Sequence, residues 1–133
     1  MPHNGEVYSV TFSPNGNYIA LEGCDKYDEN RACIQGSAQV WDANTGKEIA
    51  HMIHEGWVRA IAFSPNGNYI VSGSEDKTAR VWETSTGREI ARMTYDDWVS
   101  SVGFSPDGKM LFQEVPMVLL MFGMQPLAKK SLV

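Results

Sequence analysis

The segment Phe12-Ser-Pro-Asn-Gly-Asn-Tyr-Ile19 occurs twice in this sequence, because residues 63–70 repeat it letter for letter. A related segment, Phe104-Ser-Pro-Asp-Gly-Lys-Met-Leu111, follows 41 residues after the second copy. Each copy contains a Ser-Pro-Asn/Asp-Gly turn, in which proline sets φ and glycine supplies a positive φ. The chain is therefore built from internal repeats that share a strand, a turn and a second strand.

A second repeated block gives the period. Residues 40–50, Val-Trp-Asp-Ala-Asn-Thr-Gly-Lys-Glu-Ile-Ala, return 41 residues later as Val-Trp-Glu-Thr-Ser-Thr-Gly-Arg-Glu-Ile-Ala at 81–91. The first two copies of the Ser-Pro-Asn-Gly segment are 51 residues apart instead. The first unit therefore carries ten extra residues between its two blocks, near 26–35.

Local patterns in the second unit predict four short strands. Apolar and β-branched residues are separated by polar turns, and the expected strands are 58–63, 68–72, 78–82 and 88–93. No window of the chain keeps a 3.6-residue apolar period. The predicted fold class is all-β, with antiparallel strands.

Four strands in about 41 residues, with a histidine near the start and a Trp-Asp-like pair near the end, are typical of a propeller blade. On these motifs the chain resembles the WD40 repeat family over residues 3 to about 111. The resemblance implies an incomplete WD40-type β-propeller made of four-stranded antiparallel blades. It divides the chain into repeat 1 (1–53, with the insertion near 26–35), repeat 2 (54–94), the start of repeat 3 (95–111) and a non-repeat apolar tail (112–133).

In the WD40 family each blade holds a buried hydrogen-bonded set of histidine, serine or threonine, aspartate and tryptophan. The resemblance assigns this structural set in repeat 2 to His54, Ser72, Asp76 and Trp82. In repeat 1, Leu21 stands at the serine position, and the members kept are His3, Asp25 and Trp41. Repeat 3 begins with Tyr95 in place of the histidine. A buried polar set specifies one geometry only when every member is satisfied, so repeat 2 is expected to be the complete blade.

Composition limits the partners and the location. Eleven Lys and Arg against sixteen Asp and Glu leave a net charge of −5, so nucleic acid is not an expected partner. The apolar stretch 115–124 is about half the length of a membrane-spanning helix and contains Pro116, so no membrane partner is expected. The N-terminal residues carry no basic and apolar regions of a secretory signal, and the expected location is cytoplasmic.

The tail after Leu111 departs from the repeat in a way that the genetic code explains. When the last base of each codon is joined to the first two of the next, residues 112–133 permit the string SGSSDGTAHVWDAATGKEIAR. That string aligns in register with residues 72–92, SGSEDKTARVWETSTGREIAR. The tail is therefore expected to be a frameshifted third blade. The alternative is a divergent strand or helix that happens to permit this reading.

The number of repeats predicts an unclosed structure. A propeller needs about four to eight blades, whereas the chain carries two complete units and part of a third. The start also matches an internal position, because Met1-Pro-His3 aligns with Met52-Ile-His54. Unpaired blade faces promote association, so we expect an unstable monomer or self-association that completes a propeller.

The ten-residue insertion lengthens the segment that has Cys24 at one end and Cys33 at the other. A lengthened hairpin brings Cys24 and Cys33 close enough to bond in an oxidising compartment. The acidic residues of this segment lack the DxDxDG spacing of a calcium loop. A solvated acidic loop is therefore expected, with no metal site.

No arrangement of residues in the sequence indicates catalysis. His3 and His54 occupy the structural histidine position of the resemblance, and His51 has no identifiable partner. Ser13 and Ser64 lie in proline-containing turns without an adjacent base, as does Ser105. We therefore expect no enzyme activity and no cofactor.

Comparison of the units singles out a set of partner-binding candidates. The first strands share their apolar residues, but the positions between those residues differ from unit to unit. In WD40-like propellers the loop before the first strand lies at a rim of the disc, where partners commonly bind. Aromatic residues and arginine are favoured as interface anchors. The candidates for a partner-binding rim are Tyr8, Trp57, Arg59 and Trp98. The alternative for Trp57 and Trp98 is packing against neighbouring blades.

The sequence therefore predicts a non-catalytic scaffold that binds other proteins, as a fragment of a larger propeller. Two alternatives stay open: a non-functional truncated product of a frameshifted gene, and the propeller part of a larger signalling enzyme. Propellers host many functions, so the fold alone does not choose among them.

Overall fold

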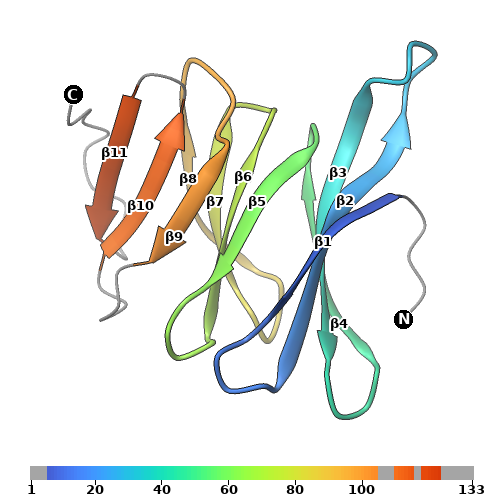
Figure 1. Cartoon of the computed structure of the whole chain (residues 1–133), viewed down its shortest axis with the longest axis vertical. Helices are drawn as coiled ribbons and strands as arrows, with labels where there is room; N and C mark the ends of the chain where they lie inside the picture. The colour runs from blue at the N-terminus through green and yellow to red at the C-terminus, as the bar shows by residue number, and fades with distance from the viewer. Residues whose placement is uncertain (1–5, 105–109, 116–117, 124–133) are drawn as a thin grey trace.

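The all-β prediction is confirmed by the structure, a computed structural model that describes residues 6–104, 110–115 and 118–123, with side chains for 9–104. Three antiparallel sheets lie side by side, and Figure 1 shows them in chain order from right to left. The described residues contain strands and turns but no helix, and none of them forms a helix able to cross a membrane.

Two of the sheets have four strands each, paired in chain order. The first consists of β1 (Glu6–Phe12), β2 (Tyr18–Tyr27), β3 (Cys33–Asp42) and β4 (Glu48–His54). The second consists of β5 (Val58–Phe63), β6 (Tyr69–Ser74), β7 (Thr78–Glu83) and β8 (Glu89–Thr94). Each four-stranded sheet has the form of one propeller blade, and we call them blade 1 and blade 2.

The third sheet has three strands: β9 (Ser101–Phe104), β10 (Met110–Val115) and β11 (Val118–Gly123). Its first pairing repeats the register of the blades, because Phe104 lies opposite Leu111 as Phe12 lies opposite Ile19. The tail, 112–133, therefore begins as paired backbone in the places of a second and a third strand. Residues 124–133 lie outside the described part of the chain.

The repeated Ser-Pro-Asn-Gly segment forms the same turn in both blades. In blade 1 the Gly16 N–H donates to the Ser13 carbonyl at 2.9 Å, and Gly16 has a φ of 75°. The Ser13 hydroxyl donates to Asn15 Oδ1 at 2.7 Å, and that oxygen also accepts the Asn17 N–H at 3.0 Å. The turn satisfies its own polar groups, which explains why the segment is identical in both units.

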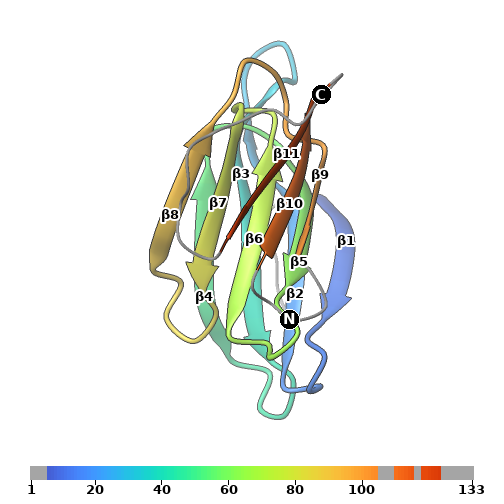
Figure 2. The same cartoon turned by 90° about the vertical axis from the view of Figure 1, so that its left-hand side faces the viewer.

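The core lies between the sheets, which stack face to face and therefore lie one behind another in the view of Figure 2. Blade 1 presents small and flexible apolar residues to blade 2: Ala38, Val40, Ala50 and Met52. Blade 2 presents the equivalent residues to the third sheet: Ala79, Val81, Ala91 and Met93. Phe63 packs into the first interface and Phe104 into the second, so the chain uses one apolar interface twice.

The insertion lengthens β2 and β3 into a hairpin that extends beyond the neighbouring turns (Figure 1). A disulfide joins Cys24 to Cys33 across its arms, with the Cα atoms 6.0 Å apart. The Asp28 carboxylate accepts the N–H groups of Asn30 and Ala32 at the tip, where the acidic side chains are exposed as expected. At the base, a Cβ on Gly36 would lie 2.8 Å from the Val58 nitrogen, so the hairpin packs directly on the loop that leads into β5.

Candidate functional site

The four residues assigned to the structural set of repeat 2 lie in one buried cluster, which we call the buried network. Trp82 Nε1 donates to Ser72 Oγ at 2.8 Å, and Ser72 Oγ lies 2.6 Å from His54 Nε2. His54 Nδ1 lies 2.9 Å from Asp76 Oδ2. The hydrogen bonds run without a break from the indole to the carboxylate when Trp82 Nε1, Ser72 Oγ and His54 Nδ1 each donate to the next residue. This arrangement requires a neutral His54 with its proton on Nδ1.

The buried network includes two residues that sequence reasoning missed. Arg80 donates from Nη2 to Asp76 Oδ2 at 3.0 Å and from Nη1 to the Ile53 carbonyl at 2.9 Å. Thr78 Oγ1 donates to Asp76 Oδ1, and Thr78 does not belong to the apolar cluster between blade 2 and the third sheet. Both residues are polar at alternate positions of β7 and point away from the Ala79 and Val81 face, which is the signal that could have found them.

Burial and hydrogen bonding set the charges of this network. Burial lowers the pKa of His54 despite the neighbouring Asp76 carboxylate, so the imidazole is neutral at pH 7. Burial alone would raise the pKa of Asp76, but hydrogen bonds from His54, Thr78 and the Glu55 N–H outweigh it and hold that pKa well below its usual range. The ionised carboxylate is matched by Arg80, so the buried charges form a pair.

Ser72, His54 and Asp76 are linked in the order of a hydrolase triad, but the arrangement cannot present a nucleophile. The side chains of Ser72 and His54 have no exposed surface. Ser72 Oγ also accepts the Trp82 N–H, so a lone pair of the oxygen that would attack is occupied. A triad needs substrate access and donors for an oxyanion next to the serine. The geometry therefore supports a structural role for the network.

Blade 1 holds a different set at the equivalent place. Leu21 replaces the serine, and the buried Trp41 Nε1 has no hydrogen-bond partner among the described residues. Asp25 instead accepts the Ser37 hydroxyl at 3.0 Å and lies 2.9 Å from His51 Nε2 on β4. His51 therefore has a partner that sequence reasoning did not identify. His3, the expected partner of Asp25, lies outside the described residues.

A buried carboxyl distinguishes blade 1 further. Glu22 stands on β2 where blade 2 has Gly73, and only 7% of it is exposed. Burial raises the pKa of Glu22 to about 7, although a hydrogen bond with the Ser9 side chain opposes the shift. Glu22 Oε2 has no hydrogen-bond partner among the described residues. Burial of the Glu22 carboxyl therefore costs blade 1 free energy of folding, whereas Gly73 in blade 2 has no polar side chain to bury.

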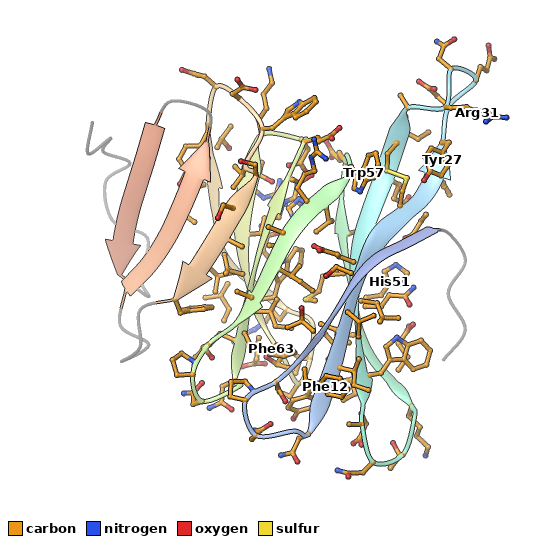
Figure 3. All side chains as sticks on the ribbon, viewed as in Figure 1. Phe12, Tyr27, Arg31, His51, Trp57 and Phe63 are labelled. Carbon is orange, nitrogen blue, oxygen red and sulfur yellow. A yellow bond between two sulfur atoms is a disulfide. The ribbon has the colours of Figure 1, made fainter. Side chains whose placement is uncertain are left out.

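The second cluster lies at the end of the molecule where the hairpin extends, and Figure 3 shows its residue Trp57 there, beside the hairpin. The Arg59 guanidinium carbon lies 5.5 Å from the ring centre of Trp57 and 5.0 Å from that of Trp98. Arg59 Nε also pairs with Glu75 Oε2 at 3.0 Å. We call these four residues the rim cluster. Three of the predicted rim candidates are thus brought together; the side chain of the fourth, Tyr8, lies outside the described residues.

Backbone irregularity places Arg59 at the rim. The β5–β6 ladder is in register at Val58 with Ser74 and shifts before Ala60, so Arg59 lies in a bulge. The Glu75 N–H donates to the Trp57 carbonyl at 2.9 Å, which holds the two loops together. The sequence did not indicate Glu75 as a member of this cluster, because the shifted register of β5 and β6 is what brings Glu75 beside Arg59. The side chains of Trp98 and Arg59 remain 43% and 37% exposed, so their mutual contact leaves surface for a partner.

The described residues contain no group of three or more His, Cys, Asp or Glu side chains able to hold a metal ion. At the acidic tip of the hairpin, Asp28 Oδ1 accepts the N–H groups of Asn30 and Ala32 from its own turn. The rim cluster is thus the one candidate site, within the described side chains, that combines exposure with an organised geometry.

Comparison with known proteins agrees with the two-blade architecture. The family model described as "WD domain, G-beta repeat" matches residues 1–42 and 46–83, more than half of the chain. The chain belongs to the WD40 repeat family. The first match ends at Asp42 and the second at Glu83, the last residues of β3 and β7. The first match contains β1 to β3, and the second contains β4 of blade 1 with β5 to β7 of blade 2.

Individual WD40 proteins resemble part of the chain. Protein HIR1 of Gibberella zeae is 35% identical over 78 residues, which cover 54% of this chain and 7% of that protein. Protein hir1 of Emericella nidulans is 39% identical over 75 residues, with the same two shares. A guanine nucleotide-binding protein subunit beta of Zea mays is 35% identical over 75 residues, 56% of this chain and 17% of that protein. The chain thus spans less than a fifth of the length of each of these relatives.

Proposed function

We propose that this WD40 chain is a non-catalytic protein-interaction module that binds partner proteins through the rim cluster. WD40 proteins generally bind other proteins, which supports the class of function. The observation that carries the choice of surface is the pair of cation–π contacts that Arg59 makes with Trp57 and Trp98 at an exposed end of the blades.

The physical argument rests on the residue types and their preorganisation. Tryptophan and arginine are the residues most enriched at the energetic centres of interfaces. Two cation–π contacts and the Glu75 ion pair hold Arg59 in one conformation before a partner arrives. Less side-chain entropy is then lost on binding, so more of the contact energy appears as affinity.

A peptide-display selection against the full chain tests this proposal. We expect binders that lose at least tenfold in affinity with Trp98→Ala, because truncation of a central interface anchor costs about 2 kcal/mol or more. Ile90→Ala is the matched control, because Ile90 is also an exposed apolar residue but lies on β8, outside the rim cluster. Equal melting temperatures of the two variants establish that both remain folded. Binders that are indifferent to Trp98→Ala and Trp57→Ala would contradict the rim assignment.

A second proposal concerns self-association through the free face of blade 1. Phe12 and Val10 are 63% and 53% exposed, whereas Phe63 and Phe104 at the equivalent position pack against the preceding sheet. Burying this face against a second copy removes exposed apolar surface, as the two internal interfaces already do. Light scattering after size exclusion is expected to give a mass above the 14.8 kDa of one chain, and Phe12→Asp is expected to lower it. A compact monomer that melts cooperatively would contradict self-association.

A third proposal is that the chain is a truncated, non-functional product of a frameshifted WD-repeat gene. It is supported by the agreement of a shifted reading of residues 112–133 with residues 72–92 along 21 positions. The nucleotide sequence decides it: a shifted frame that encodes Trp at the 122–123 junction and continues as a WD repeat is expected. A shifted frame interrupted by stop codons, or one without the repeat, would end this proposal.

We propose a cytoplasmic location, and the disulfide provides its test. Cys24–Cys33 bonds persist chiefly in oxidising compartments, whereas cytosolic thiols are kept reduced. Alkylation of thiols before cell lysis is expected to label both cysteines if the chain is cytoplasmic. Protection of both cysteines from alkylation would place the chain in an oxidising compartment instead.

A further inference from the structure

We infer that Arg59 is a recognition site for a single carboxylate of the partner, one that is flanked by basic side chains. The inference deepens the proposed function and rests on it, because it names the chemistry that the rim cluster would select. It follows from three observations: the contact of the guanidinium with two indoles, its unengaged N–H edge, and the charges of the surrounding loops.

The Arg59 guanidinium carbon lies over two indole rings. Trp57 and Trp98 both stand within 6 Å of the guanidinium carbon, at 5.5 and 5.0 Å from their ring centres. The two indoles come from equivalent positions of successive repeats, 41 residues apart, and Arg59 lies in the bulge between them. Arg59 therefore meets a partner with its guanidinium already in contact with two indoles, and its remaining N–H donors are the polar groups that it offers.

One of those edges remains available. The recorded ion pair of Arg59 uses Nε, which lies 3.0 Å from Glu75 Oε2. Nη1 and Nη2 make no hydrogen bond or ion pair within the part of the chain whose side chains are described, and the side chain is 37% exposed. An end-on pair of N–H donors matches the two oxygens of one carboxylate, which accepts both in a bidentate pair.

The surrounding charges favour a monoanion over a phosphate. Glu55, Asp96 and Asp97 are exposed on the loops that carry Trp57 and Trp98, and Glu75 is already paired with Arg59. A phosphate near −2 would meet about twice the repulsion that a carboxylate meets from these groups. The same three exposed carboxylates are complementary to lysine or arginine on either side of the bound carboxylate. The ligand class is therefore an acidic residue between basic residues.

Four labelled peptides test the inference on the full chain by fluorescence anisotropy. All are acetylated and amidated, so the central side chain supplies the only carboxylate: Lys-Lys-Glu-Lys-Lys, the same peptide with glutamine, the same with phosphoserine, and Gly-Gly-Glu-Gly-Gly. We expect the glutamate peptide to bind about tenfold more tightly than the glutamine peptide, since charge-assisted bonds are the stronger kind. The phosphoserine and glycine-flanked peptides are expected to bind more weakly than the lysine-flanked glutamate peptide.

Variants of Arg59 separate the effect of its two coplanar N–H donors from the effect of its positive charge. Arg59→Lys keeps the positive charge but loses the two coplanar donors, and we expect the glutamate-to-glutamine ratio to fall below about threefold. Arg88→Lys is the matched control, because Arg88 is an exposed arginine in the turn between β7 and β8, and the ratio is expected to stay unchanged. Arg59→Gln, with an unchanged melting temperature, provides a second variant should the lysine variant misfold.

The outcomes distinguish this inference from the proposed function. Equal binding of the glutamate and glutamine peptides, or tighter binding of the phosphoserine peptide, would overturn the carboxylate assignment while Trp98-dependent binders still support the rim. If no selected binder responds to Trp57→Ala or Trp98→Ala, the proposed function itself fails. Unchanged peptide discrimination in Arg59→Lys would show that the carboxylate is recognised elsewhere.

Discussion

Blade 1 and blade 2 share one backbone plan and differ in their buried polar residues. Both have four strands in the same order, the same Ser-Pro-Asn-Gly turn and the same Ala, Val, Ala and Met residues on one face. In blade 2 the buried network is hydrogen-bonded from Trp82 to Asp76. In blade 1, Trp41 Nε1, Gln39 Oε1 and Glu22 Oε2 are buried without a partner among the described residues.

The difference separates what forms a blade from what stabilises it. Turn chemistry and the apolar pattern are enough to set strand order and register, since blade 1 has both without the complete network. A satisfied buried network adds stability and specificity, whereas each unsatisfied polar group subtracts about 1–3 kcal/mol. Blade 2 is therefore expected to be the more stable half, and three substitution experiments test this contrast.

The largest effect is expected from Asp76→Ala. It leaves His54 and Arg80 buried without their carboxylate, and removal of one partner of a buried pair costs about 3–5 kcal/mol. Asp25→Ala in blade 1 is expected to cost less than half as much, because its partner His51 is about one-third exposed. Urea unfolding with amide exchange on β6 and β2 measures both losses. Equal losses in the two blades would remove the contrast.

An intermediate, pH-dependent effect is expected from Glu22→Gln. The pKa of Glu22 is about 7 in the folded chain and 4.5 in the unfolded chain, so the folded state binds the proton more tightly. Stability from this group is full below pH 4.5 and is lost as the pH rises through 7, by about 3 kcal/mol at most. The glutamine variant avoids this loss and should be more stable than the parent at pH 8 but not at pH 4.

Urea midpoints at several pH values between 4 and 9 measure this difference. Glu48→Gln, at an exposed position that begins β4, is the matched control and is expected to follow the parent at every pH. A constant difference between Glu22→Gln and the parent across the range would show that the carboxyl titrates normally in the folded chain.

The smallest effect is expected from tryptophan-to-phenylalanine changes. Trp82→Phe removes the donor to Ser72 and should cost about 1–2 kcal/mol more than Trp41→Phe, in which no hydrogen bond to a described residue is lost. The two changes remove the same volume, so their difference isolates the hydrogen bond. When Ser72→Ala is also present, Trp82 Nε1 has no bond to Ser72, so Trp82→Phe should cost no more than Trp41→Phe. If Trp82→Phe still costs more, the extra cost comes from packing.

Sequence repeats predicted the strands of blade 2 to within two residues, because turn residues and apolar alternation are local properties. The family resemblance named four members of the buried network, and the comparison of the repeats named three members of the rim cluster. They could not show that Arg59 pairs with Glu75, because a bulge before Ala60 sets that contact. The pairing of Asp25 with His51 was likewise hidden, since the equivalent of His51 in blade 2 is Arg92, which pairs with Glu89.

The burial of Glu22 illustrates a further limit of repeat comparison. Gly73 at the equivalent place lies so close to the next sheet that a Cβ would be 2.7 Å from Val99 Cγ1. From the sequence alone, Glu22 in blade 1 indicates a strand whose polar side faces solvent. In the structure blade 2 covers this side, and Glu22 is buried. Only the stacking of one blade on the next reveals which polar residues have lost their water.

The Cys24–Cys33 bond of the hairpin has a consequence for proteolysis. The exposed tip, 28–32, is the most accessible segment of the hairpin to a protease, and it lies wholly inside the covalent ring that the two sulfurs close. A cut there leaves both pieces joined, so the nicked chain keeps its mass on a non-reducing gel. It separates into two fragments only after reduction, which makes the hairpin a built-in reporter of the redox state of its surroundings.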